Sequence, residues 1–299
     1  SGLLKCGIEK LFVALKHYLS SRDILCIYLK KVNNELTSYY SIILVRHGEC
    51  HANTDESKFA TEPDYTIELT ENGIRQAYEA RLKLKELVGN KTLYFYVSPF
   101  WRTRSTFENI VCSFPRSQFE YSEEPRLREQ EWGYLRTYAE LKQLKKERKE
   151  YGIFYYRFPG GEAGTDVYDY INDLLGSLHR DFQRENYPRN CILVTHSLAI
   201  RLFVMRWFHL TVEEFEQMLS PKNGQLVVLQ LNEETDDYEL LTPLERDENA
   251  VLEAGQSGCP AHNSRPSRRK ETAPRTCHVF INRNVKTKIF SCGHFYFIG

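Results

Sequence analysis

Three short apolar runs, each followed by a segment with helical periodicity, constrain the fold of this chain more than any other feature. They are residues 41–45, 92–97 and 191–195, and each is short and apolar enough for a fully buried strand. Strands that alternate with helices form a mostly parallel sheet, because each connecting helix returns the chain to the edge where it started. The sequence therefore predicts a three-layer α/β sandwich, with helices on both faces of a mostly parallel central sheet.

End signals and periodicity predict where the helices lie. Thr70 is a candidate N-cap, and the helix after it places Ile74, Ala77, Tyr78 and Leu82 on one face, which we expect to face the core. Further helices are expected at about 100–114, 138–151, 165–182 and 198–208, with closing strands at 226–231 and 238–241.

The chain divides into three regions of different character. Residues 1–40 form an N-terminal extension in which about 7–20 has the pattern of an amphipathic helix. Residues 41–244 carry the α/β pattern and are predicted to be the catalytic domain. Residues 245–299 form a basic tail, which we interpret as a disordered, solvated segment; binding to an anionic surface or a nuclear address is the alternative. The cysteines and histidines of the tail match no regular zinc-finger spacing, so we expect no metal there.

Composition excludes several classes of partner. Lysine plus arginine equals aspartate plus glutamate, 40 of each, so the overall charge gives no reason to expect nucleic acid. Charged residues interrupt the most apolar early stretch, about 11–29, so no membrane span is expected. The eight cysteines include no CxxC pair, which favours a reducing compartment and a cytoplasmic location, with the nucleus as a second. Cys112 and Cys191 are expected to be small core residues.

Polar side chains follow all three apolar runs at the point where each ends. The first is followed by Arg46 and His47, the second leads to Arg102, and the third ends at His196. The carboxyl ends of parallel strands meet at one edge of a sheet, where ligands bind. Any one of these residues alone is explained as a rim or surface group, but four such groups together would repel one another without an anion between them. Phosphate fits, because a guanidinium donates two parallel hydrogen bonds to its oxygens.

These groups predict phosphoryl transfer through a histidine. Neutral imidazole is a competent nucleophile when a hydrogen bond on one ring nitrogen aims the other. Gly48, directly after His47, would let backbone atoms approach closely. The positive charges of Arg46, Arg102 and a protonated His196 would stabilise the transferred group in place of a metal, so neither metal nor other cofactor is predicted.

The predicted general acid is Glu129. A carboxyl partly desolvated beside Trp132 would have a raised pKa and could donate a proton to the leaving group. The alternative is an ordinary surface salt bridge, because Arg126 and Arg128 are close in sequence.

Four segments together resemble the histidine phosphatase superfamily, the phosphoglycerate-mutase-like proteins. They follow that family's order: Leu44–Glu49, Ser98–Thr103, Leu127–Glu129 and Val194–Ser197. The resemblance covers about residues 41–244 and implies the phosphoglycerate-mutase-like fold. It is closest to a plant and fungal branch of broad-specificity, phosphatase-like members, through the stretches 63–70, 95–100, 151–159 and 207–215.

The resemblance also implies a role for each site residue. His47 would be the phosphorylated histidine and Glu129 the proton donor. The groups around the phosphate would be Arg46, Asn53, Arg102 and His196. The family usually has glycine where this chain has Ser197, whose side chain would either crowd the phosphate or add a hydrogen-bond donor.

The predicted function is hydrolysis of small phosphomonoesters through a phosphohistidine intermediate, without a metal. A phosphoglycerate mutase-type phosphotransferase is one alternative; it would need extra basic groups and a substrate loop after His47, where this chain has the acidic and polar stretch Cys50–Ser57. A catalytically weak phospho-ligand-binding pseudoenzyme is another. Two features stay open: Tyr155–Phe158 would either lie over the pocket or pack in the core, and Arg201 would either reach the pocket or hold a surface or supporting position. The sequence does not give the oligomeric state.

Overall fold

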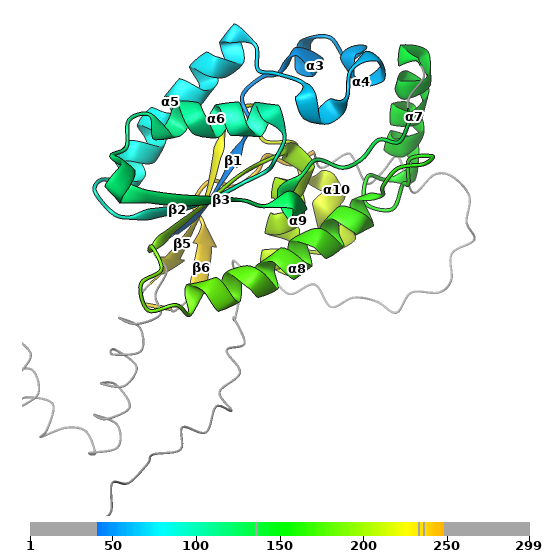
Figure 1. Cartoon of the computed structure of the whole chain (residues 1–299). Coiled ribbons are helices and arrows are strands. Elements are labelled where there is room, and N and C mark those ends of the chain that lie inside the picture. The colour runs from blue at the N-terminus through cyan, green and yellow to red at the C-terminus, as the bar shows by residue number, and fades with distance from the viewer. Residues whose placement is uncertain (1–40, 135–136, 233, 236, 248–299) are drawn as a thin grey trace, which may run out of the picture.

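The computed structural model describes residues 41–134, 137–232, 234–235 and 237–247. They form a six-stranded sheet with helices on both faces (Figure 1). The strands are β1 Ser41–Arg46, β2 Leu93–Val97, β3 Phe119–Glu123, β4 Asn190–Thr195, β5 Leu226–Asn232 and β6 Asp237–Leu240. The helices are α3 His51–Thr54, α4 Lys58–Thr61, α5 Glu71–Val88, α6 Trp101–Val111, α7 Tyr138–Tyr151, α8 Gly164–Phe182, α9 Ser197–Trp207 and α10 Val212–Gln217. Short 3₁₀ turns are η1 Asp64–Thr66, η2 Arg116–Gln118 and η3 Pro125–Leu127.

The order of strands across the sheet is β3-β2-β4-β1-β5-β6. Strands β1 and β2 both pair in parallel with β4, and β3 pairs in parallel with β2. Strand β5 runs antiparallel to β1, and β6 antiparallel to β5. The predicted mostly parallel sheet is confirmed, and the carboxyl ends of β1, β2 and β4 lie at one edge.

Alternate side chains of the central strands point to opposite faces, and different helices cover each face. Ile42 and Leu44 of β1 pack in one cluster with residues of α8 and α9. Ile43 and Val45 pack in a second cluster with residues of α5 and α6. Burial on both faces explains why these strands are continuous apolar runs rather than alternating ones.

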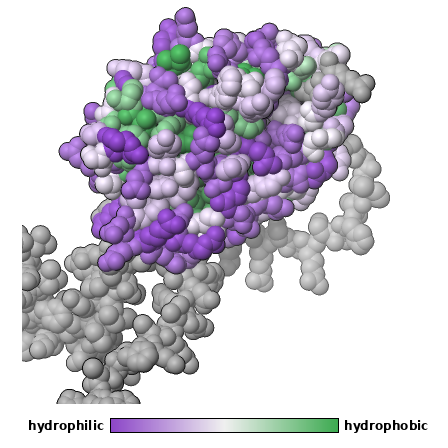
Figure 2. Space-filling view, in the orientation of Figure 1, coloured by the Kyte–Doolittle hydropathy of each residue, from purple (hydrophilic) through white to green (hydrophobic). Residues whose placement is uncertain are grey.

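Helix α5 begins where predicted, but it turns a different face to the sheet. The Thr70 hydroxyl accepts a hydrogen bond from the Gly73 amide at 3.0 Å and caps the helix. The expected core residues Ile74, Tyr78 and Leu82 are 45%, 49% and 51% exposed. Small side chains let the helix approach the strands closely, and its buried positions are Gly73, Ala77, Ala80, Leu84 and Val88. The face of the molecule shown in Figure 2 is mostly hydrophilic, with small apolar patches.

Two further features differ from the sequence-based prediction. Strand β3 was not predicted, because this edge strand has no continuous apolar run: Phe119 is buried while Glu120 and Tyr121 are exposed. Cys112 was expected in the core but is exposed, since it follows the last turn of α6 at the surface. Cys191 is buried as predicted. The helix expected at about 7–20, and the tail from residue 248 with its cysteines and histidines, lie outside the described residues. No helix in the described ranges is long and apolar enough to cross a membrane.

The turn after β1 packs against the start of α5 at two glycines. A Cβ on Gly48 would lie 2.3 Å from the Gly73 carbonyl oxygen, and a Cβ on Gly73 would lie 2.0 Å from the Glu49 carbonyl oxygen. The Glu49 carboxylate also accepts hydrogen bonds from Thr70 Oγ1 at 2.7 Å and Asn72 Nδ2 at 3.1 Å. The close approach predicted at Gly48 is therefore confirmed, and it fixes the backbone on either side of the turn.

Substitution at this contact should be costly. We expect Gly73→Ala to lower the free energy of unfolding by about 1–3 kcal/mol, because neither backbone segment can move away without disturbing the turn. The matched control is Gly176→Ala in α8, where a Cβ would meet only the end of Arg180 at 3.8 Å. There alanine should stabilise by about 0.5–1 kcal/mol through helix propensity. Urea unfolding measures both changes, and equal effects at the two sites would contradict the tight contact.

Candidate active site

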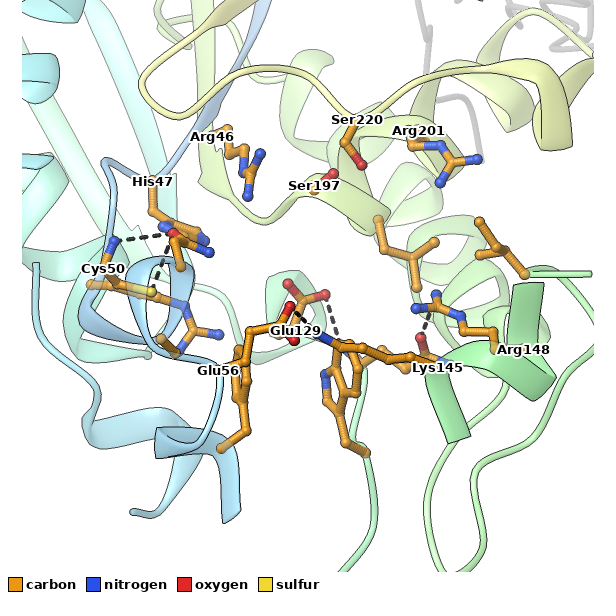
Figure 3. A pocket seen from close by; sticks show the side chains of 18 residues that line it. Arg46, His47, Cys50, Glu56, Glu129, Lys145, Arg148, Ser197, Arg201 and Ser220 are labelled. Atoms are coloured by element: carbon orange, nitrogen blue, oxygen red, sulfur yellow. Dashed lines mark hydrogen bonds and ion pairs between the residues drawn. The ribbon is translucent and has the colours of Figure 1, made fainter. Parts of the chain in front are cut away.

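The carboxyl ends of β1, β2 and β4 border a cavity of about 370 Å³ (Figure 3). Six of the predicted site residues line it: Arg46, His47, Asn53, Arg102, Glu129 and Ser197. The seventh, His196, is fully buried beside it, with its ring centroid 5.2 Å from that of His47. Three strand ends thus bring the predicted residues together at one place.

His47 is held in one orientation and kept uncharged. Its Nδ1 lies 2.7 Å from the carbonyl oxygen of Gly48, so the ring proton sits on Nδ1 and Nε2 is left with a free lone pair. The side chain is only 3% exposed. Burial, together with the nearby Arg102 and Arg46, holds the pKa of His47 well below its ordinary value. A neutral imidazole with one free nitrogen is the form required of a nucleophile.

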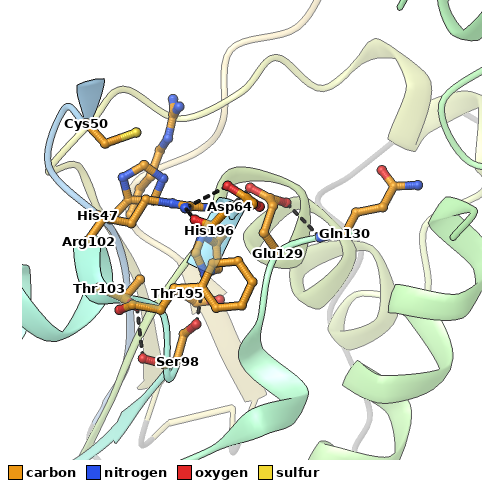
Figure 4. Close-up of polar contacts among 12 residues, drawn as sticks. His47, Cys50, Asp64, Ser98, Arg102, Thr103, Glu129, Gln130, Thr195 and His196 are labelled. Atoms are coloured by element: carbon orange, nitrogen blue, oxygen red, sulfur yellow. Dashed lines mark hydrogen bonds and ion pairs between the residues drawn. The ribbon is translucent and has the colours of Figure 1, made fainter. Parts of the chain in front are cut away.

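His196 is also neutral, contrary to the prediction of a protonated ring. Burial, with the charge of Arg102 next in importance, holds its pKa well below the ordinary value. Its Nε2 lies 2.8 Å from Ser98 Oγ, and its Nδ1 lies 3.7 Å from Glu129 Oε2 (Figure 4). A Ser98 hydroxyl that donates to Nε2 places the ring proton on Nδ1, which makes His196 a neutral donor beside Glu129.

Arg102 has a counter-ion that sequence reasoning missed. The guanidinium is 2% exposed and donates from Nη1 to the Asp64 carboxylate at 2.9 Å and to the Asp64 carbonyl at 2.6 Å. Asp64 begins the turn η1 and belongs to no chemical motif. The signal that could have found it is physical: a buried arginine needs an acidic partner, so an acidic residue had to be supplied by another segment.

A loop before β5 supports the other side of the site, and it too was missed. Asn223 Nδ2 donates to the His47 carbonyl at 3.2 Å and to Asn53 Oδ1 at 3.1 Å. The Cys50 amide also donates to Asn53 Oδ1, which leaves Asn53 Nδ2 as the group able to donate to a ligand. Arg46 Nη1 donates to the Pro221 carbonyl at 2.6 Å. This loop carries backbone acceptors and an amide rather than a chemical motif, so it gave no signal in the sequence.

Helix α9 contributes its amino terminus to the site. His196 is its N-cap and Ser197 its first residue. The free amide groups of a first helical turn, and the positive end of the helix dipole, favour an anion. Ser197 Oγ is buried and has no hydrogen-bond partner in the described part of the chain. Of the two alternatives for Ser197, this favours a hydrogen-bond donor over a side chain that crowds the phosphate.

Glu129 has the environment predicted for a general acid. Burial raises its pKa, although the charge of Arg102 opposes this shift. The alternative, a surface salt bridge, is not what forms: Arg126 pairs with Glu124 and Asp173, and Arg128 pairs with Glu162. A raised pKa keeps this carboxyl protonated at acidic pH, where it can give up a proton.

The cavity favours an anion over a cation. Potential ligand atoms of His47, Glu129 and His196 lie within 4.8 Å of one another, a grouping that could hold a metal ion. However, the positive charges of Arg46 and Arg102 act on both histidines and lower their pKa values. The same charges repel a metal ion and attract a phosphate.

Two open questions from the sequence are settled. Phe158 is fully buried and stacks on Trp132 with centroids 5.0 Å apart, whereas Tyr155 is 59% exposed. No residue of the Tyr155–Phe158 stretch lines the cavity. Arg201 is buried and lines the cavity, rather than lying at the surface.

The fold and these side chains define the class of protein. A parallel α/β sheet that presents two histidines, two arginines and a carboxyl to one anion-attracting cavity is that of the histidine phosphatases. A family model described as the histidine phosphatase superfamily, branch 1, matches residues 42–242, and the chain belongs to this superfamily.

Relatives agree with this assignment and with the predicted plant and fungal branch. The chain is 40% identical over 212 residues to phosphoglycerate mutase-like protein AT74 of Arabidopsis thaliana, covering 67% of each chain. It is 27% identical over 296 residues to broad-range acid phosphatase DET1 of Saccharomyces cerevisiae, covering 68% of this chain and 89% of that one. Among solved structures, a mycobacterial glucosyl-3-phosphoglycerate phosphatase shares the fold with a TM-score of 0.53 and 18% identity, covering 69% of this chain and 98% of the other.

Proposed function

We propose that this protein is a phosphatase that hydrolyses small phosphomonoesters through a phosphohistidine on His47, without a metal ion. The observation that carries the proposal is the state of His47: its Nδ1 is bound to the Gly48 carbonyl, and burial and two arginines lower its pKa. This leaves a neutral Nε2 in a cavity that attracts phosphate. A site that only binds phosphate needs neither a free imidazole nitrogen nor a protonated carboxyl, which argues against a pseudoenzyme.

In the proposed reaction His47 is first phosphorylated and then dephosphorylated. In the first, the Nε2 lone pair forms a bond to phosphorus, the bond from phosphorus to the ester oxygen breaks, and the proton of Glu129 goes to the leaving oxygen. In the second, the Glu129 carboxylate takes a proton from a water molecule, whose oxygen bonds to phosphorus as the bond to His47 breaks. Arg46, Arg102 and the amino terminus of α9 stabilise the charge on the phosphoryl oxygens in both steps.

Hydrolysis is favoured over mutase-type transfer. The stretch after His47 supplies Glu56 to the cavity, where its carboxylate pairs with Lys145 at 2.5 Å. This ion pair neutralises one of the basic groups that could otherwise hold a phosphorylated product. A relative of this chain is named a broad-range acid phosphatase. The mutase remains the second candidate, because Arg148 and Arg201 also line the cavity.

We further propose a cytoplasmic or nuclear location. Cys50, Cys112 and Cys191 are free thiols, as expected in a reducing compartment.

A hydrolysis screen in EDTA tests the function. Wild-type protein should release inorganic phosphate from several phosphomonoesters at a rate that the chelator does not change, and His47→Ala should abolish release while remaining folded. Activity that disappears in EDTA and returns with a divalent ion would refute the metal-free mechanism. Transfer between two positions of a substrate, with little free phosphate, would favour the mutase.

The pH dependence should follow Glu129. Because its pKa is raised and the protonated form is the active acid, kcat/KM for alkyl phosphates should be highest at acidic pH and fall as pH rises through that pKa. His47 stays neutral at acidic pH because its own pKa is lowered. Glu129→Gln should lower kcat/KM for an alkyl phosphate by about 10²–10⁴-fold and flatten the profile.

The leaving group provides the control for this prediction. A nitrophenyl phosphate needs no proton on its leaving oxygen, so Glu129→Gln should change its kcat/KM far less. Equal losses for the alkyl and the nitrophenyl ester would mean that Glu129 is not the acid.

A further inference from the structure

The Glu129 carboxyl is held in place mainly by the backbone that carries it. It accepts one hydrogen bond, at 3.1 Å, from the amide of the next residue, Gln130 (Figure 4). The Nδ1 of His196 lies 3.7 Å from it, which is beyond hydrogen-bond distance. No side chain from another element in the described part of the chain donates a hydrogen bond to this carboxyl. The position of the proposed acid therefore depends on how residues 128–131 are fixed.

One residue, Glu162, binds the chain on both sides of Glu129. Its carboxylate accepts hydrogen bonds from Arg128 Nη2 at 2.5 Å and from the Glu131 amide at 3.0 Å. Its backbone amide donates to the Glu131 carbonyl at 2.8 Å, and its carbonyl accepts a hydrogen bond from Gln130 Nε2 at 2.8 Å. Three neighbours of Glu129 are thus attached to a single residue.

Helix α8 anchors Glu162 to the core. Glu162 lies just before α8, which begins at Gly164, and its Oε1 accepts a hydrogen bond from the Tyr170 hydroxyl at 2.8 Å. The guanidinium of Arg128 lies over the Tyr170 ring, 4.2 Å from its centroid. The buried side of α8 packs in the core cluster that covers one face of β1. The fold thus connects the sheet to the acid through α8 and Glu162.

The backbones of the two segments are in direct contact. A Cβ on Gly161 would lie 2.5 Å from the Glu131 carbonyl oxygen, so no larger residue fits there. The Glu162 carboxylate is buried, with 11% of its side chain exposed, and Arg128 supplies the opposite charge. Buried ion pairs add little net stability relative to apolar groups of the same size. What this carboxylate adds is geometry, because its charge-assisted hydrogen bonds fix directions as well as distances.

We propose that Glu162 is a positioning residue for the general acid. Its carboxylate holds residues 128–131 in one arrangement, which keeps the Glu129 carboxyl at the cavity wall beside His196 and aimed at the leaving oxygen. The inference rests on the proposed phosphatase activity, and it assigns a part in the reaction to a residue that does not line the cavity.

Proton transfer is sensitive to such positioning. The acid must come within about 2.6–3.2 Å of the oxygen that it protonates, and a displacement of about 1 Å can lower the rate by about 10²-fold. In the phosphorylation step, a displaced Glu129 slows only those esters whose leaving oxygen needs a proton. His47 and the phosphate-binding arginines belong to other segments and keep their places.

Glu162→Gln tests the proposal with two substrates. The variant keeps the size of the side chain but loses the charge that Arg128 binds. We expect kcat/KM for an alkyl phosphate to fall about tenfold to a hundredfold, and kcat/KM for a nitrophenyl phosphate, which needs no acid, to stay within about twofold of wild type. The inhibition constant of inorganic phosphate should not change. The pH at which kcat/KM for the alkyl ester falls should also stay where wild type has it.

The matched control is Glu124→Gln. Glu124 also binds an arginine close in sequence, Arg126, and the two carboxylates are buried alike, with 13% of the Glu124 side chain exposed against 11% for Glu162. In the described ranges the hydrogen bonds of the Glu124 side chain go to Arg126 and not to residues 128–131. This variant should keep the wild-type ratio of kcat/KM for the two esters.

Thermal unfolding shows whether each variant is folded. If Glu162→Gln does not fold, Arg128→Gln removes the other half of the ion pair at a side chain that is 30% exposed, and it should show the same selective loss.

A double variant separates positioning from support of the fold. If Glu162 acts through Glu129, adding Glu162→Gln to Glu129→Gln should lower kcat/KM for the alkyl ester no further. Four results would overturn the proposal while leaving the phosphatase intact: an unchanged rate for the alkyl ester, equal losses for the two esters, additive losses in the double variant, or a displaced pH profile, which would mean that Glu162 acts through its charge. Failure of wild type to hydrolyse any ester would instead refute the proposed function.

Discussion

The site depends on one hydrogen bond, between His47 Nδ1 and the carbonyl oxygen of the next residue, Gly48. That bond settles which nitrogen carries the proton, and it can form only if the backbone at this turn is held still. The contact between Gly48 and Gly73 holds it on one side, where no Cβ fits. Asn223 holds it on the other by donating to the His47 carbonyl. The reactive side chain is thus fixed by close packing of two backbone segments and by one side-chain hydrogen bond to its own backbone.

Positive charge is distributed unevenly around that histidine, and the distribution explains the chemistry. Arg102 is neutralised in part by Asp64, whereas Arg46 donates to a backbone carbonyl and keeps its full charge. Burial and these two cations lower the pKa of both histidines, and burial raises the pKa of Glu129. The reaction of a phosphate dianion requires a neutral imidazole as nucleophile, a protonated carboxyl as acid and positive charge to stabilise the phosphoryl oxygens, and these pKa shifts and arginines favour all three.

The sequence predicted the parts of this protein that follow from periodicity or from strand ends, and it missed those that follow from contacts. Buried strands of the parallel sheet are continuous apolar runs, so β1, β2 and β4 and the residues after them could be predicted. The edge strand β3 has no such run. The inward face of α5 was predicted wrongly. Close packing on the sheet requires small residues such as Gly73, Ala77 and Ala80, whereas helical periodicity considers only which positions are apolar and not their size. Asp64 and Asn223 come from loops without a motif. The neutral state of His196 depends on the charges and burial that surround it in three dimensions.

The central claim is that phosphate is carried on Nε2 of His47, and rapid-quench trapping tests it most directly. Enzyme mixed with a nitrophenyl phosphate for milliseconds, quenched in alkali and digested, should yield one phosphorylated peptide, with the phosphate on His47. Phosphorus NMR of that peptide should assign the phosphate to Nε2, since Nδ1 is bonded to the Gly48 carbonyl. Phosphate found on Nδ1 or on another residue, or a burst of nitrophenol with no phosphorylated peptide, would contradict the account.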